Sequence, residues 1–387
     1  MAHDGSIKFD TKLDSTGLEN GLSAVKKMAL GVGATLGLGK LGSKVIKFGS
    51  DFESAMSSVA AISMATGEEF EMLSNAAKEM GETTKYSATQ AANALEYLSL
   101  AGYSAEESVR ALPQVLNLAA AGGMDLAYAS DLLTDSMAVM ELGIDDMGNF
   151  SDQLAMAASK SNTSVQQLGE AVLVAGGQAK LANMSVDEMN TALGILADKG
   201  IKGSEGGTML RNVLKNLYTP TSASAKELEK LGVKTADATG ELRPMQDVLQ
   251  DLQGALKNLT AEDKMNAMAN IFDSRTISGA SALLADCGDR WNELNGYLND
   301  CDGAAERMAE TMNDNLKGQL TLASSAAEGL GIAVYEGIEG PLKEAVKTGT
   351  KCIGELTQSV KSGALKGAVE GVGKLFGGLV TAISNIA

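Results

Sequence analysis

Apolar residues in the middle of the chain recur at helical spacing behind serines that can cap a helix. The apolar positions are Ala91, Leu95, Leu98 and Ala101 after Ser87, and Met189, Leu193, Leu196 and Ala197 after Ser185. Residues spaced in this way lie on one face of an α-helix, so each stretch predicts a helix with one face packed against a partner. We therefore predict two helix pairs, 87–101 with 104–121 and 164–180 with 185–199.

Serine capping boxes mark the starts of these helices, and glycines mark the ends. In a capping box, a serine hydroxyl accepts a bond from the amide of the third helical residue, whose Gln or Glu side chain accepts one from the serine amide. The boxes begin at Ser87, Ser104, Ser164 and Ser185, and glycines that can end helices stand at positions 102, 122–123, 143 and 200. The repeated caps fit a plain array of helical hairpins, with a weak internal duplication as the alternative.

The predicted fold class is all-α: an elongated multi-helix array of helical hairpins with helical extensions at both ends. One stretch, from Gly232 to Gly240, is expected to be extended, and Pro244 suits the first turn of the helix that follows it. We expect three regions. They are an N-terminal arm with an apolar, glycine-rich helix (1–50), a helical core (51–300) and a glycine-spaced helical tail (301–387).

Composition supports a helical chain with a core and few bulky side chains. Hydrophobic residues make up 44% and charged residues 21%, which is too rich in core-forming residues for disorder throughout. Aromatic residues make up only 4%, which argues against an antiparallel β protein. The 32 basic and 49 acidic side chains give a net charge of −17, which opposes a surface that neutralises phosphates. We therefore expect no sequence-specific binding to nucleic acid.

Few residues in this chain are of the types that catalyse reactions or bind metals. The one histidine, His3, lies in a polar N-terminal stretch, so histidine zinc sites and Ser-His-Asp triads have no internal imidazole. Three cysteines without a Cys-x-x-Cys pair, Cys287, Cys301 and Cys352, indicate buried or idle thiols. Paired acidic residues stand at helix starts, where they complement the helix dipole. We expect no catalytic residues, no cofactor and no metal, and so no enzyme.

Two glycine-rich segments look like phosphate-binding loops but lack residues that such loops need. In the first, Ala34 stands where the first glycine of the Walker pattern belongs, and Leu41 replaces the Ser or Thr that would hold magnesium. In the second, Glu205 would repel phosphate and no lysine follows the glycines. We interpret the second segment as a tight turn between helices, in which Gly206 and Gly207 pack closely.

Glycines recur every four residues near both ends of the chain. They are Gly33 and Gly37, then Gly363, Gly367 and Gly371, and separately Gly373 and Gly377. This spacing puts them on one helix face and lets two backbones approach closely, as in membrane helix pairs. The uncharged runs 28–39 and 375–387 are shorter than the about 20 residues that span a bilayer. Tight helix packing and binding at a membrane surface therefore both stay open for these ends.

Short blocks along residues 46–290 occur in an order that is typical of one family. They are Phe52–Met56, Thr84–Leu98, Ala101–Gly102, Leu118–Gly122, Leu196–Ile201, Gly206–Leu214, Leu217–Pro220, Leu231–Val233, Asp237–Gly240, Ile271–Phe272 and Ser278–Ala280. The most specific block is Gly-Gly-Thr-Met-Leu-Arg-Asn-Val-Leu at 206–214. Together the blocks resemble the core region of phage tail tape measure proteins, as does the opening Asp4–Lys8.

The resemblance implies a structural virion protein, encoded by a phage or prophage, rather than an enzyme. Such proteins lie in the tail lumen as several helical copies, act as the template for tail tube assembly and length determination, and are expelled at genome ejection. Implied partners are the tail tube protein, tail assembly chaperones, baseplate or tail-tip proteins, other copies of the chain, and the host membrane. The implied location is the bacterial host cytoplasm during assembly and then the virion. The residues themselves leave an alternative, a membrane-active helical protein without a ruler role.

We predict that the isolated chain self-associates, because glycine-faced helices at both ends need close neighbours. The net charge of −17 opposes association, so added salt should strengthen it by screening repulsion over about 8 Å at physiological strength. Replacing both Gly367→Leu and Gly371→Leu should weaken association by forcing helices apart. Light scattering tests this, and a strict monomer at tens of micromolar in both low and high salt would contradict it.

Overall fold

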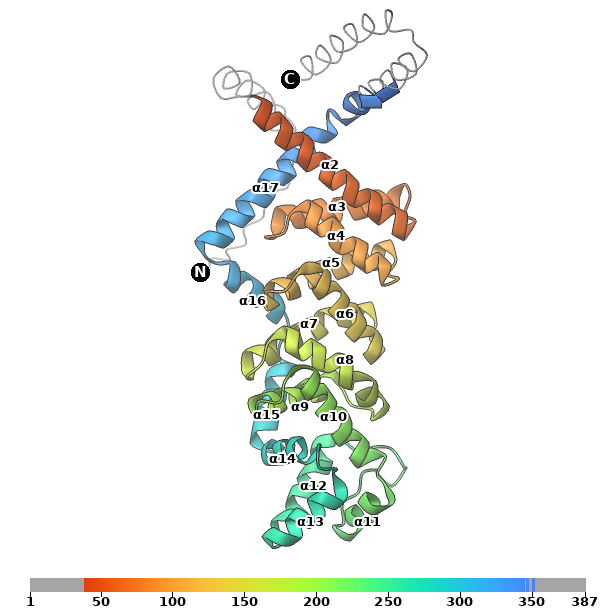
Figure 1. Ribbon diagram of the computed structural model, residues 1–387, viewed down its shortest axis with the longest axis vertical. Coiled ribbons are helices and arrows are strands. Elements are labelled where there is room, and N and C mark those ends of the chain that lie inside the picture. The colour runs from red at the N-terminus through yellow and green to blue at the C-terminus, as the bar shows by residue number, and fades with distance from the viewer. Residues whose placement is uncertain (1–37, 345, 348–349, 352–387) are drawn as a thin grey trace, which may run out of the picture. The chain divides into compact units, whose positions relative to one another are not determined.

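The computed structural model describes residues 38–344, 346–347 and 350–351, and this part of the chain is helical almost throughout (Figure 1). In chain order the helices are α2 (Leu38–Ser63), α3 (Glu68–Thr83), α4 (Ala88–Leu100), α5 (Ala105–Gly122), α6 (Leu126–Met140), the 3-10 helix η1 (Ile144–Asp146), α7 (Met147–Lys160), α8 (Val165–Leu181), α9 (Val186–Asp198), α10 (Gly203–Tyr218), α11 (Ser222–Lys230), α12 (Met245–Lys257), α13 (Ala261–Ile271), α14 (Ile277–Asp286), α15 (Asp289–Asn299), α16 (Ala304–Asn313) and α17 (Leu316–Glu336). The predicted all-α class and helical array are confirmed.

The chain divides into two compact units. The terminal unit combines residues 1–50 with 330–387, and the central unit is the continuous segment 51–329, so both boundaries fall inside helices α2 and α17. The three-region division expected from the sequence stays a prediction. The seven glycines of the predicted packing faces lie outside the described residues.

The described part of the terminal unit packs through glycines. Gly49 of α2 lies directly against the ring of Tyr335, and a methyl group at Gly331 would lie 2.7 Å from the Phe48 ring. Ile332, on the same helix as Gly331, is 1% exposed. The two helices can therefore approach closely because glycine carries no side chain at the contact.

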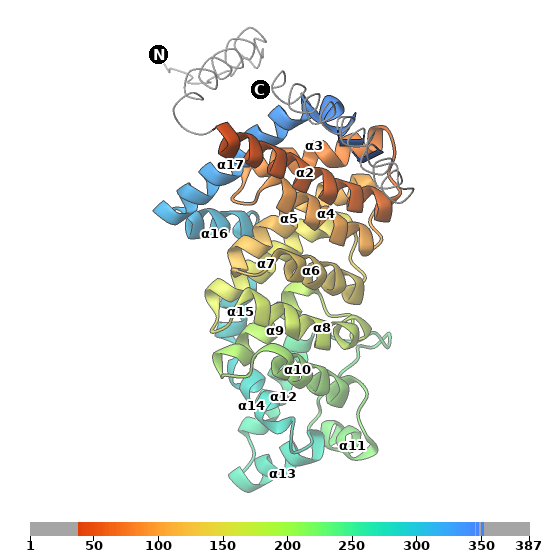
Figure 2. The ribbon, with the colours of Figure 1, turned by 45° about the horizontal axis from the view of Figure 1, so that its top comes forward.

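The central unit is a stack in which each helix packs on the next helix and on the next but one. From α3 to α10, helices contact their neighbours in this overlapping way, and α8 with α10 forms the most extensive of these contacts. The last helices then reverse direction, because α15 packs on α9 and α7, and α16 packs on α7 and α5 (Figures 1 and 2). Non-local contacts therefore hold the end of the unit against its beginning.

Both predicted helix pairs are confirmed, as α4 with α5 and α8 with α9, and the first pair has complete capping boxes. The Ser87 hydroxyl accepts the Gln90 amide at 3.3 Å, and the Ser87 amide donates to the Gln90 side chain at 3.0 Å. Ser104 and Glu107 make the same two bonds at 3.3 and 2.8 Å. These four bonds satisfy amides that a helix start leaves without partners.

In the second pair, each predicted capping box makes only one of its two hydrogen bonds. Ser185 accepts the amide of Glu188 at 3.3 Å, but the Glu188 carboxylate accepts the amide of Gln246 instead of the serine amide. The reason is tertiary: α12 starts after Pro244, which offers no side-chain cap, so Glu188 fills that place. Burial raises the pKa of Glu188. The box at Ser164 likewise lacks its return bond.

The predicted glycine stops are confirmed except at one position. Gly102, Gly123 and Gly200 have positive φ angles of 90°, 60° and 87°, which L-residues rarely adopt. The stop at Gly143 is wrong, because α6 ends earlier and Glu141 takes the left-handed conformation at φ 53°. Gly143 instead precedes η1 with an ordinary φ of −83°.

The extended segment is present but minimal. Its antiparallel contact is one isolated bridge between Ala236 and Leu242, and the described residues contain no strand. The Asp237 carboxylate holds the turn by accepting the amides of Thr239 and Glu241 at 2.8 and 3.0 Å. Pro244 lies one residue before α12 rather than in its first turn.

Helix α9 is buried on all its faces. Nine consecutive residues, Met189–Ala197, are buried, whereas the apolar spacing predicts one buried face. The helix contacts α7, α8, α10, α14 and α15, so neighbours from both directions of the chain surround it. A helix without a solvent face belongs to the centre of a core.

The close packing predicted for Gly207 is confirmed, although the residue lies inside α10 rather than in the turn before it. A methyl group there would overlap the Ala171 carbonyl oxygen of α8 and lie 2.9 Å from the Ala171 Cα. Both obstacles are backbone, which cannot move aside without shifting a helix.

We predict opposite effects for two glycine-to-alanine changes in helices. Gly207→Ala should destabilise the protein by about 1–3 kcal/mol, because the new methyl group overpacks the α8–α10 contact. Gly254→Ala in α12 meets nothing within 4 Å and should stabilise by up to about 1 kcal/mol. Urea denaturation of both variants measures the changes, and a shift in the same direction would contradict the assigned contact.

Candidate functional site

The candidate site is the return segment, which we define as residues 289–329: α15, α16 and α17 as far as Gly329. It lies alongside helices that precede it by more than 90 residues, α9, α7 and α5 (Figures 1 and 2). Long-range polar and apolar contacts gather along it. These contacts lie at successive levels along the segment, from α15 through α16 to α17.

The first level is apolar and involves the chain's one tryptophan. Trp291 in α15 is 1% exposed, and Leu294 and Leu298 on the same helix are fully buried. Leu294 packs into the space left by Gly194 of α9, where a methyl group would lie 2.6 Å from it. Leu294 therefore covers part of α9 that would otherwise meet water, and apolar burial of this kind drives docking.

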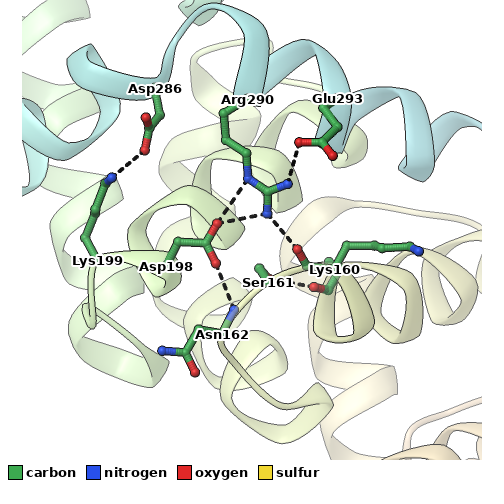
Figure 3. A network of polar contacts seen from close by, with 9 residues as sticks. Lys160, Ser161, Asn162, Asp198, Lys199, Asp286, Arg290 and Glu293 are labelled. Atoms are coloured by element: carbon green, nitrogen blue, oxygen red, sulfur yellow. Dashed lines mark hydrogen bonds and ion pairs between the residues drawn. The ribbon is translucent and has the colours of Figure 1, made fainter.

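Arg290 joins the C-terminal ends of two helices to α15 (Figure 3). Its guanidinium donates to the Asp198 carboxylate at 2.9 and 3.2 Å and to the Lys160 carbonyl at 2.6 Å. It also donates to Glu293 at 2.9 Å, and Asp198 in turn accepts the Asn162 amide at 2.9 Å. Lys160 and Asp198 end α7 and α9, and a cation at a helix C-terminus complements the helix dipole.

A second ion pair lies beside this network. Lys199, next to Asp198, pairs with Asp286 of α14 at 2.8 Å, and that partner raises the pKa of Lys199 (Figure 3). Exposed ion pairs contribute little to stability, so the value of this network is mainly to fix the register between helices.

The next level is a helix cap supplied from another helix. Asp152 of α7 is 9% exposed, and its carboxylate accepts the amides of Gly303 and Ala305 at 2.7 and 2.9 Å. Gly303 is the residue before α16 and has no side chain to cap that helix. Asp152 therefore does for α16 what an N-cap side chain does within its own helix.

The last level closes the segment onto the first helices of the unit. The Ser325 hydroxyl donates to the Lys85 carbonyl at 3.0 Å. The Thr89 amide, at the start of α4, donates to the Glu328 carboxylate at 3.2 Å. About 240 residues separate the partners in each bond.

A cleft of about 450 Å³ opens between the return segment and α3, α5 and the segment that joins α3 to α4. Its lining includes the carboxylates of Glu306, Glu310 and Asp314, and, across from α16, Lys85 and Tyr86. The Tyr86 hydroxyl is buried without a hydrogen-bond partner, and burial raises its pKa. A raised pKa keeps this hydroxyl protonated at neutral pH, so it is not an activated base.

Two cysteines are buried free thiols, Cys287 just before the return segment and Cys301 within it. Burial, and then the negative charge of Asp152, raise the pKa of Cys301 to about 11. A thiol that stays protonated is a poor nucleophile. Cys352 lies outside the described residues. Within the part of the chain that the structure describes, no group of three His, Cys, Asp or Glu side chains could hold a metal ion.

Sequence reasoning placed its candidate residues at the chain ends and missed this site. The predicted glycine faces stay a prediction, and among the described residues close glycine packing also occurs in the middle of the chain, for example at Gly169, Gly194 and Gly207. The one signal for the return segment was its tryptophan, the largest apolar side chain available, which usually anchors a core. No local pattern reveals that Asp152 caps a helix 150 residues later.

Comparisons with known proteins identify the family to which the chain belongs. Residues 74–273, slightly more than half of the chain and all within the central unit, match the family model described as phage-related minor tail protein. The chain therefore belongs to the phage-related minor tail protein family. No helix among the described residues is both long and apolar enough to cross a membrane.

Curated relatives match nearly the whole chain. The tape measure protein of Pneumococcus phage Dp-1 is 33% identical over 91% of this chain and 30% of its own length. The probable tape measure protein of Escherichia phage P2 is 28% identical over 93% of this chain and 45% of its own length. A probable tape measure protein of Clostridium phage phiCD119 is 21% identical over 92% of this chain. The chain spans less than half the length of these relatives, and no solved structure matches it.

We predict that the Asp152 cap stabilises the unit. Asp152→Ala should destabilise it by about 1–3 kcal/mol, because two amides at the start of α16 lose their acceptor. Asp152→Asn should cost less, since an amide oxygen still accepts. Asp302→Ala, in the loop just before α16, removes the same charge without these bonds and should change stability by less than about 0.5 kcal/mol. Equal urea midpoints for Asp152→Ala and Asp302→Ala would contradict the cap.

Proposed function

We propose that this chain is part of a phage tail tape measure protein, the template around which the tail tube polymerises and which determines tail length. The observation that carries the proposal is the match to the tape measure protein of Pneumococcus phage Dp-1 over 91% of the chain. The relatives from two other phages carry the same name and match a similar share of the chain. Membership of the minor tail protein family supports a place in the tail.

Helical structure suits a ruler for a physical reason. An α-helix rises about 1.5 Å per residue, so a continuous helix converts the number of residues into a fixed length. A continuous helix of 387 residues would reach about 580 Å. The described residues are helical almost throughout, but as separate helices that pack on one another rather than as one continuous helix.

The proposal includes partners and a location. The chain contacts the tail tube protein, the tail assembly chaperones, baseplate or tail-tip proteins and further copies of itself. It is made in the host cytoplasm, occupies the lumen of the virion tail and leaves ahead of the DNA, with contact to the host membrane at that stage. It works without catalysis.

An in-frame deletion of the gene segment tests the tape measure role. We expect electron micrographs of the deletion strain to show absent tails or tails of altered length, because the tube has lost its template. A plasmid copy of the wild-type gene should restore normal tails. Normal tails of unchanged length would rule out the ruler role. If such tails fail to infect, a membrane-active helical protein becomes the better explanation.

A further inference from the structure

We infer that the central unit, residues 51–329, stays folded in the tail as a closed body and adds almost none of its chain length to the ruler. The inference rests on the proposed tape measure function. It divides the protein into residues outside this unit, which contribute to the measured tail length, and residues inside it, which do not.

The chain enters and leaves the central unit at the same corner. At the entrance, the Phe52 ring is 5% exposed and lies 5.7 Å from the Lys78 ammonium of α3. At the exit, Ser325 and Glu328 bond to the segment that joins α3 to α4 and to the start of α4. Because entrance and exit both contact this corner, the separation of the two ends does not grow with the number of residues between them.

Contacts along the return segment hold this closed form at several levels. Arg290 ties it to α9 and α7 across 92 and 130 residues, and Asp152 ties it to α7 across about 150. A continuous helix would break all of these bonds together. It would also expose the nine buried residues of α9, seven of which are apolar or glycine.

The sequence between the helices opposes a continuous helix as well. Pro220 and Pro244 stand between helices, and each lacks the amide that an unbroken helix needs at that position. Glu141 and Asn183 hold left-handed conformations in other connections. The interruptions between helices therefore come from the local sequence and not from tertiary contacts alone.

The closed form and a continuous helix differ greatly in length. A continuous helix of the 279 residues from 51 to 329 would be about 420 Å long, whereas the 18 residues of α5 make a helix of about 27 Å. In the closed form, residues 89 and 328 are neighbours. In an extended helix, about 360 Å would separate them.

Photo-cross-linking in assembled tails distinguishes these forms. One full-length variant replaces Glu328 with the photoreactive residue p-benzoylphenylalanine. A second replaces Tyr297, whose ring lies 4.4 Å from the Lys160 ammonium of α7, so the aromatic shape is retained. Each variant is irradiated as purified protein and inside purified tails. Products are separated on denaturing gels, and mass spectrometry of the single-chain band locates the joined peptides.

We expect the same products in both samples, position 328 joined to residues 85–89 and position 297 joined to residues near 160, in a band that migrates as one chain. Products present in the purified protein but lost in tails would overturn the inference and leave the tape measure role standing. Failure of both probes in the purified protein would also overturn it. Absence of the chain from purified tails would overturn the proposed function itself.

Discussion

Helix α9 has no face for water, and the central unit is organised around this constraint. Helices α7, α8, α10 and α14 cover part of α9, and α15 covers more of it, with Leu294 packed against Gly194. An apolar helix face left open would destabilise the unit through exposed apolar surface. The core therefore needs the return segment to cover its apolar surface. The polar contacts of Arg290 and Asp152 determine the position at which the segment packs.

The return segment also gives the unit its mechanical character. Most stacking contacts in the central unit join helices that are close in sequence, which alone would allow a stack to open one helix at a time. Hydrogen bonds between residues 92 to 240 positions apart prevent this stepwise opening. One layer of helices cannot separate unless its contacts with the neighbouring layers break as well. Local stacking and long-range closure together join these 279 residues into one compact unit.

The helices were predictable from the sequence, and the closure was not. Ser87 and Ser104 cap their helices through neighbours three residues away, so local reading finds them. Glu188 has the same local pattern, but the uncapped start of α12 takes its carboxylate, and only the tertiary structure reveals this competitor. The Asp152 cap and the burial of α9 on every face depend in the same way on residues more than 90 positions away.

Dependence of α9 on α15 has a consequence for synthesis. A ribosome adds about 5–20 residues each second, and about 100 residues separate the end of α9 from the end of α15. For roughly 5–20 seconds, each nascent chain therefore carries the apolar residues of α9 without the part of their cover that α15 supplies. Several neighbouring ribosomes on one message would hold such chains close together. The order in which the gene is read thus creates a brief period when aggregation competes with folding, and it ends only when the tryptophan of α15 has emerged.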